Sequence, residues 1–115
     1  MADVTLTNEA DYLLCRIYKG YLEQRKSGVF RENAVIFGDA EAVQENYAQL
    51  WPVNDIEDAI RELARADFIA CLWADNTFWH GHLTTKAIVY MENRFSNNLA
   101  KLAQRINAVK SLLSI

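Results

Sequence analysis

The stretch that decides the fold runs from residue 54 to residue 95 and reads NDIEDAIRELARADFIACLWADNTFWHGHLTTKAIVYMENRF. In its first part, apolar residues recur at helical spacing, which predicts a helix from Asn54 to about Ala66. Asn54, with Glu57 three residues later, has the pattern of a capping box, which satisfies free backbone N–H groups at a helix start. A helix therefore opens the stretch.

Two short apolar segments follow this helix, residues 68–73 and 78–83, and they predict an antiparallel hairpin. The turn between them is centred on Asp75-Asn76, because both residue types tolerate the positive φ angles of a tight hairpin turn. Thr84 would end the second strand and cap the helix that follows. The stretch thus predicts the order helix, hairpin, helix.

Alternation along the two strands predicts which side chains face the core. One face would hold Phe68, Ala70, Leu72, Trp79 and Leu83 against the core, and the other would present Ile69, Cys71, Trp73, Phe78, His80 and His82. The second face is more apolar than a solvated hairpin requires, and aromatic side chains are typical anchors of protein interfaces. Trp73, Phe78 and His80 are therefore candidate protein-binding residues, unless the first or the last helix covers this face.

Two further helices are predicted before residue 54. Thr7 and Asp39 are suitable N-caps for helices that run from residue 8 to about residue 27 and from residue 40 to about residue 50. The apolar stripe of the first of these helices is wide enough to be packed on two sides. Residues 29–37 predict either a short helix or a buried turn.

The composition indicates one folded, mainly helical domain, because 115 residues with 51% hydrophobic residues, four Gly and one Pro can build a single core. The longest strictly apolar run, residues 68–74, is too short to cross a bilayer. Residues 1–5 lack the pattern of a secretory signal. The two cysteines lie in apolar segments, as reduced thiols do. We expect a cytoplasmic protein without a membrane segment.

Charge is divided unevenly along the chain, although the net value is only −3. Residues 1–92 carry eight Lys and Arg against fifteen Asp and Glu, whereas residues 93–115 carry four Lys and Arg and no acid. An acidic body and a basic tail argue against a protein that covers nucleic acid or anionic membrane with its whole surface. Any partner must suit this division.

Sites for metal or covalent chemistry are weakly indicated. Cys71, His80 and His82 could share one face of the hairpin and hold zinc, but such residues are more often packing or surface residues. The serines lack the glycine-flanked elbow of a hydrolase, and the four glycines form no phosphate-binding loop. We therefore expect no metal, no cofactor and no enzyme activity.

A second apolar pattern covers the C-terminal segment. Its residues follow one another at steps of three and four, as in a coiled coil: Ile88, Met91, Phe95, Leu99, Leu102, Ile106, Val109 and Leu113. A continuous helix from Thr85 to Ile115 would be roughly 45 Å long. Ser96-Asn97-Asn98 could interrupt it, because Ser and Asn favour caps and turns.

The distal part of this pattern predicts a homodimer, because a small body offers little of its own chain to cover it. The dimer would be built on residues 88–113, in an antiparallel crossing or with each tail docked on the partner's acidic body near Glu41 and Glu45. The residues expected at the interface are Phe95, Leu99, Leu102, Ile106, Val109 and Leu113.

Residues 40–95 resemble the winged-helix superfamily, and the long terminal helix is similar to that of the dimeric MarR and PadR regulators. Ile60-Arg-Glu-Leu63 followed by Asp67-Phe-Ile69 resembles their junction between helix and wing, and Leu83-Thr-Thr-Lys-Ala87 resembles their step from wing to last helix. Asp67 and Ala87 stand where these families usually have Gly. The resemblance implies a mainly α, α+β fold, with a winged-helix domain over residues 1–95 and a dimerisation helix over residues 96–115, within one structural domain.

The resemblance also implies a dimeric DNA-binding transcriptional regulator. Arg61 and Arg65 on the helix of residues 54–66 would contact guanine edges or phosphates, and Lys86 would contact phosphate. That helix carries four acidic residues against two arginines, and the hairpin tip has no Lys or Arg. The alternative is an acidic adaptor or inhibitor that binds another protein instead of DNA.

Overall fold

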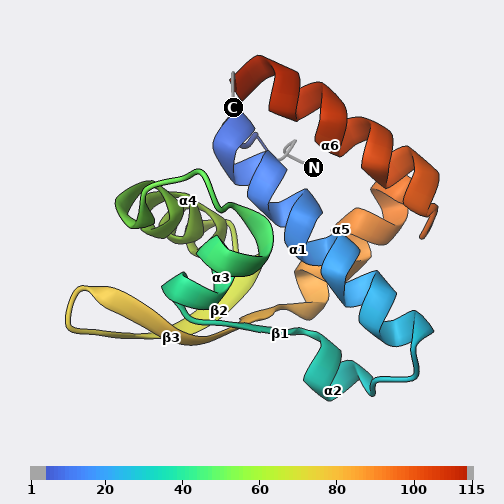
Figure 1. Cartoon of the computed structure of the whole chain (residues 1–115). Coiled ribbons are helices and arrows are strands. Elements are labelled where there is room, and N and C mark those ends of the chain that lie inside the picture. The colour runs from blue at the N-terminus through green and yellow to red at the C-terminus, as the bar shows by residue number, and fades with distance from the viewer. Residues whose placement is uncertain (1–4, 114–115) are drawn as a thin grey trace.

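The computed structural model describes residues 5–113 (Figure 1). The chain is mainly helical with one small antiparallel sheet, as the sequence predicts. In chain order the elements are α1 (Asn8–Lys26), α2 (Arg31–Ala34), β1 (Ile36–Gly38), α3 (Ala40–Tyr47), α4 (Val53–Arg65), β2 (Ile69–Ala74), β3 (Thr77–Leu83), α5 (Thr85–Phe95) and α6 (Leu99–Leu113).

Three helices begin at the caps that the sequence predicts. The side chains of Thr7, Asp39 and Thr84 accept hydrogen bonds of 3.0–3.2 Å from backbone N–H groups three residues later. The predicted capping box at Asn54 is wrong. Helix α4 begins one residue earlier, at Val53, with Pro52 at the N-cap and no side-chain cap. Asn54 is therefore already inside the first helical turn.

The sheet has the strand order β1-β3-β2, and both pairings are antiparallel. The predicted turn is confirmed, because Asp75 and Asn76 have φ angles of 53° and 63°. Asp67 also has a positive φ, 63°. Strand β1 is the third strand, and it lies in a segment for which the sequence predicts only a short helix or a buried turn.

A β-bulge in β3 decides which hairpin side chains face the core. Leu72 pairs with Trp79 but Ala70 pairs with His82, so that His80 and Gly81 together oppose a single residue of β2. His80 takes up this distortion with a φ of 50°. One extra residue reverses the alternation of a strand.

The predicted assignment of hairpin faces is therefore wrong in part. Phe78 and Ile69, expected on the outer side, are buried in the core. Leu72 and Trp79, expected in the core, are exposed.

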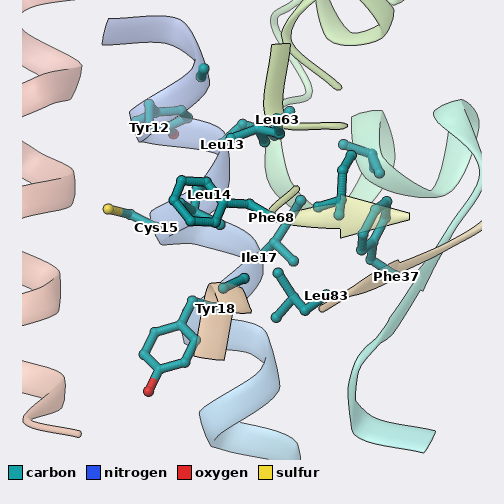
Figure 2. Close-up of a cluster of buried hydrophobic side chains, with 14 of the residues drawn as sticks. Tyr12, Leu13, Leu14, Cys15, Ile17, Tyr18, Phe37, Leu63, Phe68 and Leu83 are labelled. Carbon is teal, nitrogen blue, oxygen red and sulfur yellow. The ribbon is translucent and has the colours of Figure 1, made fainter. Parts of the chain in front are cut away.

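Helix α1 is packed on two sides, as the width of its apolar stripe predicts. Figure 2 shows Ile17 near Phe68 and Leu83 of the sheet side, with Leu13 on the same side of the helix, whereas Cys15 points toward α6. All five side chains are buried.

Among the described residues, no helix has the length and the apolar character that a membrane crossing requires.

The C-terminal segment forms two helices instead of one continuous helix. Ser96 and Asn97 have left-handed φ angles of 51° and 56°, and the Asn98 side chain then accepts from the backbone N–H groups of Ala100 and Lys101. The interruption that Ser96-Asn97-Asn98 suggests is confirmed. It turns α6 back along α1 (Figure 1).

The apolar stripe of α6 is covered by its own chain. Phe95, Leu102, Ile106 and Val109 are buried, and Leu99 and Leu113 are half-buried, all against the common core. The reasoning that the body cannot cover this stripe is therefore wrong. The homodimer stays a prediction, but a dimer through the stripe requires α6 to leave α1.

A buried carboxylate ties α6 to the body. Asp11 on α1 accepts hydrogen bonds from Arg94 at 2.6 and 3.0 Å and from Arg105 at 2.7 and 3.0 Å. The acidic body and the basic tail thus meet within one chain, at Asp11. Burial raises the pKa of Asp11, but the hydrogen bonds and charges of the two arginines outweigh it and hold the pKa below its ordinary value.

Candidate functional site

The sheet presents an uncharged face to solvent. None of the residues of β1, β2 and β3 is Asp, Glu, Lys or Arg. Directly paired residues share one face of a sheet, and the pairs here are Ile36 with His82, Ala70 with His82, and Leu72 with Trp79. We call these five residues the outer sheet face.

Three large apolar side chains on the outer sheet face are in contact with solvent. Ile36 is 49% exposed, Leu72 is 64% exposed and Trp79 is 43% exposed. They belong to three different strands, so the apolar surface is spread across the sheet. Single exposed apolar residues are common, but a group of them without intervening charges is typical of an interaction surface.

The outer sheet face is hollowed by a pocket of about 430 Å³. Its lining consists of Ile36, Ala70, Cys71, Leu72, His80 and His82. Burial raises the pKa of the Cys71 thiol to about 11, so this cysteine is a neutral, weakly polar part of the wall. Within residues 5–113, no group of three His, Cys, Asp or Glu side chains is placed to hold a metal ion.

The predicted protein-binding residues are divided by the structure. Phe78 is fully buried, with its ring 6.3 Å from that of Phe37 and 5.7 Å from that of Trp73. The expectation that Phe78 lies on the outer face is therefore wrong, because the bulge turns it inward. Trp73 is partly exposed beside α4, and His80 is exposed at the bulge.

The predicted DNA-binding residues are exposed, but two of them make contacts within the chain. Arg61 stacks over the Trp73 ring at 5.1 Å and donates to the Asn76 carbonyl at 3.3 Å, which joins α4 to the hairpin tip. Lys86 donates to the Ala66 carbonyl at 3.0 Å and so caps the C-terminus of α4. Arg65 has no ion-pair partner among the described residues.

The exposed side of α4 has both signs of charge. Asp55 and Asp58 lie on it together with Arg61 and Arg65. Glu62 accepts from the backbone N–H and the hydroxyl of Thr7 at 2.8 and 2.7 Å, so its charge also fastens the start of α1. This helix therefore offers no uniform positive potential.

Sequence reasoning missed Ile36, Leu72 and Trp79 as surface residues. A strict alternation places Leu72 and Trp79 in the core, and only the bulge at His80-Gly81 corrects it. A possible signal was Gly81 itself, because an isolated Gly within a strand pattern suggests a bulge or a close backbone approach.

In comparisons with known proteins, no family model, no curated protein and no solved structure matches this chain.

Proposed function

We propose that this chain is a winged-helix domain that acts by binding another protein through its outer sheet face. The order of α3, α4, β2, β3 and α5 supports the winged-helix assignment, with α4 in the position of the recognition helix and the β2–β3 hairpin as the wing. The observation that carries the binding proposal is the exposed, charge-free group of Ile36, Leu72 and Trp79.

Protein interfaces have this composition at their centre. Charged residues are depleted there, and aromatic residues are enriched. A few Trp, Tyr or Arg side chains commonly supply most of the binding free energy. Trp79, with Leu72 paired beside it and the pocket at Cys71, provides such an anchor and a cavity for a side chain of the partner.

Duplex DNA suits this face poorly. Phosphate contacts by Lys and Arg supply most of the non-specific affinity for DNA. The sheet has no such residue, and the turn between its strands contributes only Asp75 as a charge. The wing would therefore bring apolar and acidic groups toward the DNA backbone.

The test compares the wild-type chain with two double variants in pull-downs from the native host. Leu72→Ser with Trp79→Ser removes the apolar side chains of the outer sheet face. Val89→Ser with Leu112→Ser is the matched control, because both residues are exposed apolar side chains on helices elsewhere. A partner that wild type and control retain, and that the sheet variant loses, is then purified.

With the purified partner, we expect the sheet variant to bind at least about thirtyfold more weakly, as loss of an interface hot spot does. Equal capture by all three chains would overturn the proposal. Sedimentation equilibrium adds a second check. A wild-type dimer that becomes a monomer only in the sheet variant would mean that the face binds a second copy of this chain instead of another protein.

One observation favours DNA as the second candidate. Arg61 and Arg65 are both exposed and lie one turn apart on α4, where a winged helix contacts the major groove. We expect Arg61→Gln with Arg65→Gln to abolish any such binding. Retention of the wild type on heparin, with saturable and salt-sensitive binding to duplex DNA that this variant loses, would favour the DNA-binding regulator over the protein-binding domain.

A further inference from the structure

A second pocket, away from the sheet, lies where three parts of the chain meet. It has a volume of about 300 Å³ and is bounded by α1, by the end of α3 with the connection into α4, and by α6. Two cations, Arg16 on α1 and Lys110 on α6, belong to its lining, and no acidic residue does. In a chain with an excess of acid, this is an unusual local excess of positive charge.

Both cations have unused hydrogen-bonding capacity. Arg16 makes one long hydrogen bond, 3.4 Å to the Asn46 carbonyl, although a guanidinium has five N–H donors. Lys110 makes no side-chain hydrogen bond or ion pair within residues 5–113. The ion pairs found among the described residues join Asp11 to Arg94 and to Arg105, and they involve neither Arg16 nor Lys110.

Tyr47 also belongs to the lining of the pocket. The Tyr47 hydroxyl lies against the backbone of Gly20 and has no hydrogen-bond partner among the described residues. Burial raises the pKa of Tyr47, so the hydroxyl stays protonated and uncharged. The lining formed by the described residues therefore carries two cations and no acidic side chain.

The rest of the pocket is apolar. Tyr12 and Trp51 are buried and stacked, with ring centroids 5.6 Å apart, and they form a firm wall. Leu50 is largely exposed at the rim, where it could cover the apolar part of a ligand. The volume is at the lower end of the range for small-molecule sites.

We propose that this pocket binds a small organic anion, with its carboxylate or phosphate group held by Arg16 and Lys110 and its apolar part against Trp51 and Leu50. Arginine offers a paired N–H edge to such oxygens, and lysine adds a point charge. Because Lys110 belongs to α6, a bound anion would also join this helix to the segment that leads into α4.

The test is an NMR titration of the full chain at constant ionic strength. Benzoate is the carboxylate probe, phenyl phosphate is the phosphate probe, and benzamide is the neutral analogue. We expect saturable shifts of the backbone amides between Asn46 and Trp51 and of the Trp51 indole N–H with at least one of the two anions. Benzamide should produce no saturable shift, because it lacks the charge that the two cations recognise.

Variants assign the binding to this pocket. Arg16→Gln and Lys110→Gln should each weaken the anion about tenfold, the effect of losing one charge-assisted hydrogen bond. Lys101→Gln is the matched control, because it also removes an exposed charge from α6 but lies outside the pocket lining. Lys110→Gln removes no hydrogen bond or ion pair of residues 5–113, so it remains decisive if Arg16→Gln impairs folding.

Several results would overturn the proposal: no saturable shift with either anion, equal shifts with benzamide, or unchanged affinity in Lys110→Gln. Binding of inorganic phosphate as tight as that of phenyl phosphate would overturn the role of the apolar wall. This site is independent of the outer sheet face, so its failure would leave the proposed function untouched.

Discussion

Replacement of Asp11 by Asn should destabilise the fold more than any change of a surface charge. The Asp11 side chain is 7% exposed and accepts four hydrogen bonds from two arginines. Asn keeps the shape but removes the charge, so Arg94 and Arg105 lie close together without their anion. Breaking a buried ion pair in this way costs about 3–5 kcal/mol.

The loss here should be smaller, because water reaches both arginines. Their side chains are 24% and 40% exposed, so solvent can hydrate some of the freed N–H groups. We therefore expect Asp11→Asn to lower the free energy of unfolding by about 2–3 kcal/mol. Arg105→Gln should cost only about 1 kcal/mol, because Arg94 still neutralises the carboxylate.

Urea unfolding followed by circular dichroism at pH 7 measures these differences. Asp58→Asn is the control for charge alone, since Asp58 is exposed on α4, and its effect should stay within about 0.5 kcal/mol. A loss below about 1 kcal/mol for Asp11→Asn would refute the reasoning that this carboxylate fastens α5 and α6 to α1.

The stabilisation that Asp11 provides should also depend on pH. The folded pKa of Asp11 lies below its ordinary value of 3.8, so the stabilisation is complete above that value and is lost as the pH falls through the lower, folded pKa. The difference in unfolding free energy between wild type and Asp11→Asn should therefore shrink in acid below about pH 4. A difference that stays constant down to pH 2, about two units below the ordinary pKa, would contradict this assignment.

Three further predictions concern the core, the C-terminal helix and the thiols. Gly81→Ala should lower the free energy of unfolding by about 1–3 kcal/mol, because the added Cβ would overlap with the Phe37 ring. An unchanged midpoint of urea unfolding would contradict the close packing at the bulge. Leu102→Asp should unfold the chain or release α6 instead of separating a dimer into folded monomers, because Leu102 is fully buried within its own chain. Sedimentation combined with circular dichroism distinguishes these outcomes. Alkylation at pH 8 followed by mass spectrometry should modify Cys71 slowly and Cys15 only after unfolding. Burial raises the pKa of the Cys71 thiol to about 11 and that of the Cys15 thiol to about 12, and Cys15 is also fully buried. Rapid labelling of native Cys15 would show that α6 opens readily.

The sequence by itself determined the features that depend on neighbouring residues. The caps at Thr7, Asp39 and Thr84 and the turn at Asp75-Asn76 each require only a suitable side chain within a few residues of a backbone N–H or a positive φ. These signals predicted the main helices and the hairpin. The capping box at Asn54 failed because Pro52 offered a competing start two residues earlier.

The candidate site depended on a feature that no local pattern determines. Whether Leu72 and Trp79 face water is decided by the bulge at His80-Gly81, where the Phe37 ring packs directly against Gly81. Phe37 is distant in sequence and lies within β1, a strand that the sequence does not predict. The outer sheet face could therefore be identified only from the tertiary structure, in which β1 pairs with β3.

The position of the last helix was also decided by tertiary structure. Apolar residues at steps of three and four describe a seam, but such a seam is equally suited to a second chain and to a helix of the same chain. The left-handed backbone at Ser96-Asn97 reverses the chain, and the Asp11 carboxylate on α1 then pairs with Arg105 on α6. The sequence determined that α6 has an apolar face, and the contact between residues more than ninety positions apart decided that α1 covers it.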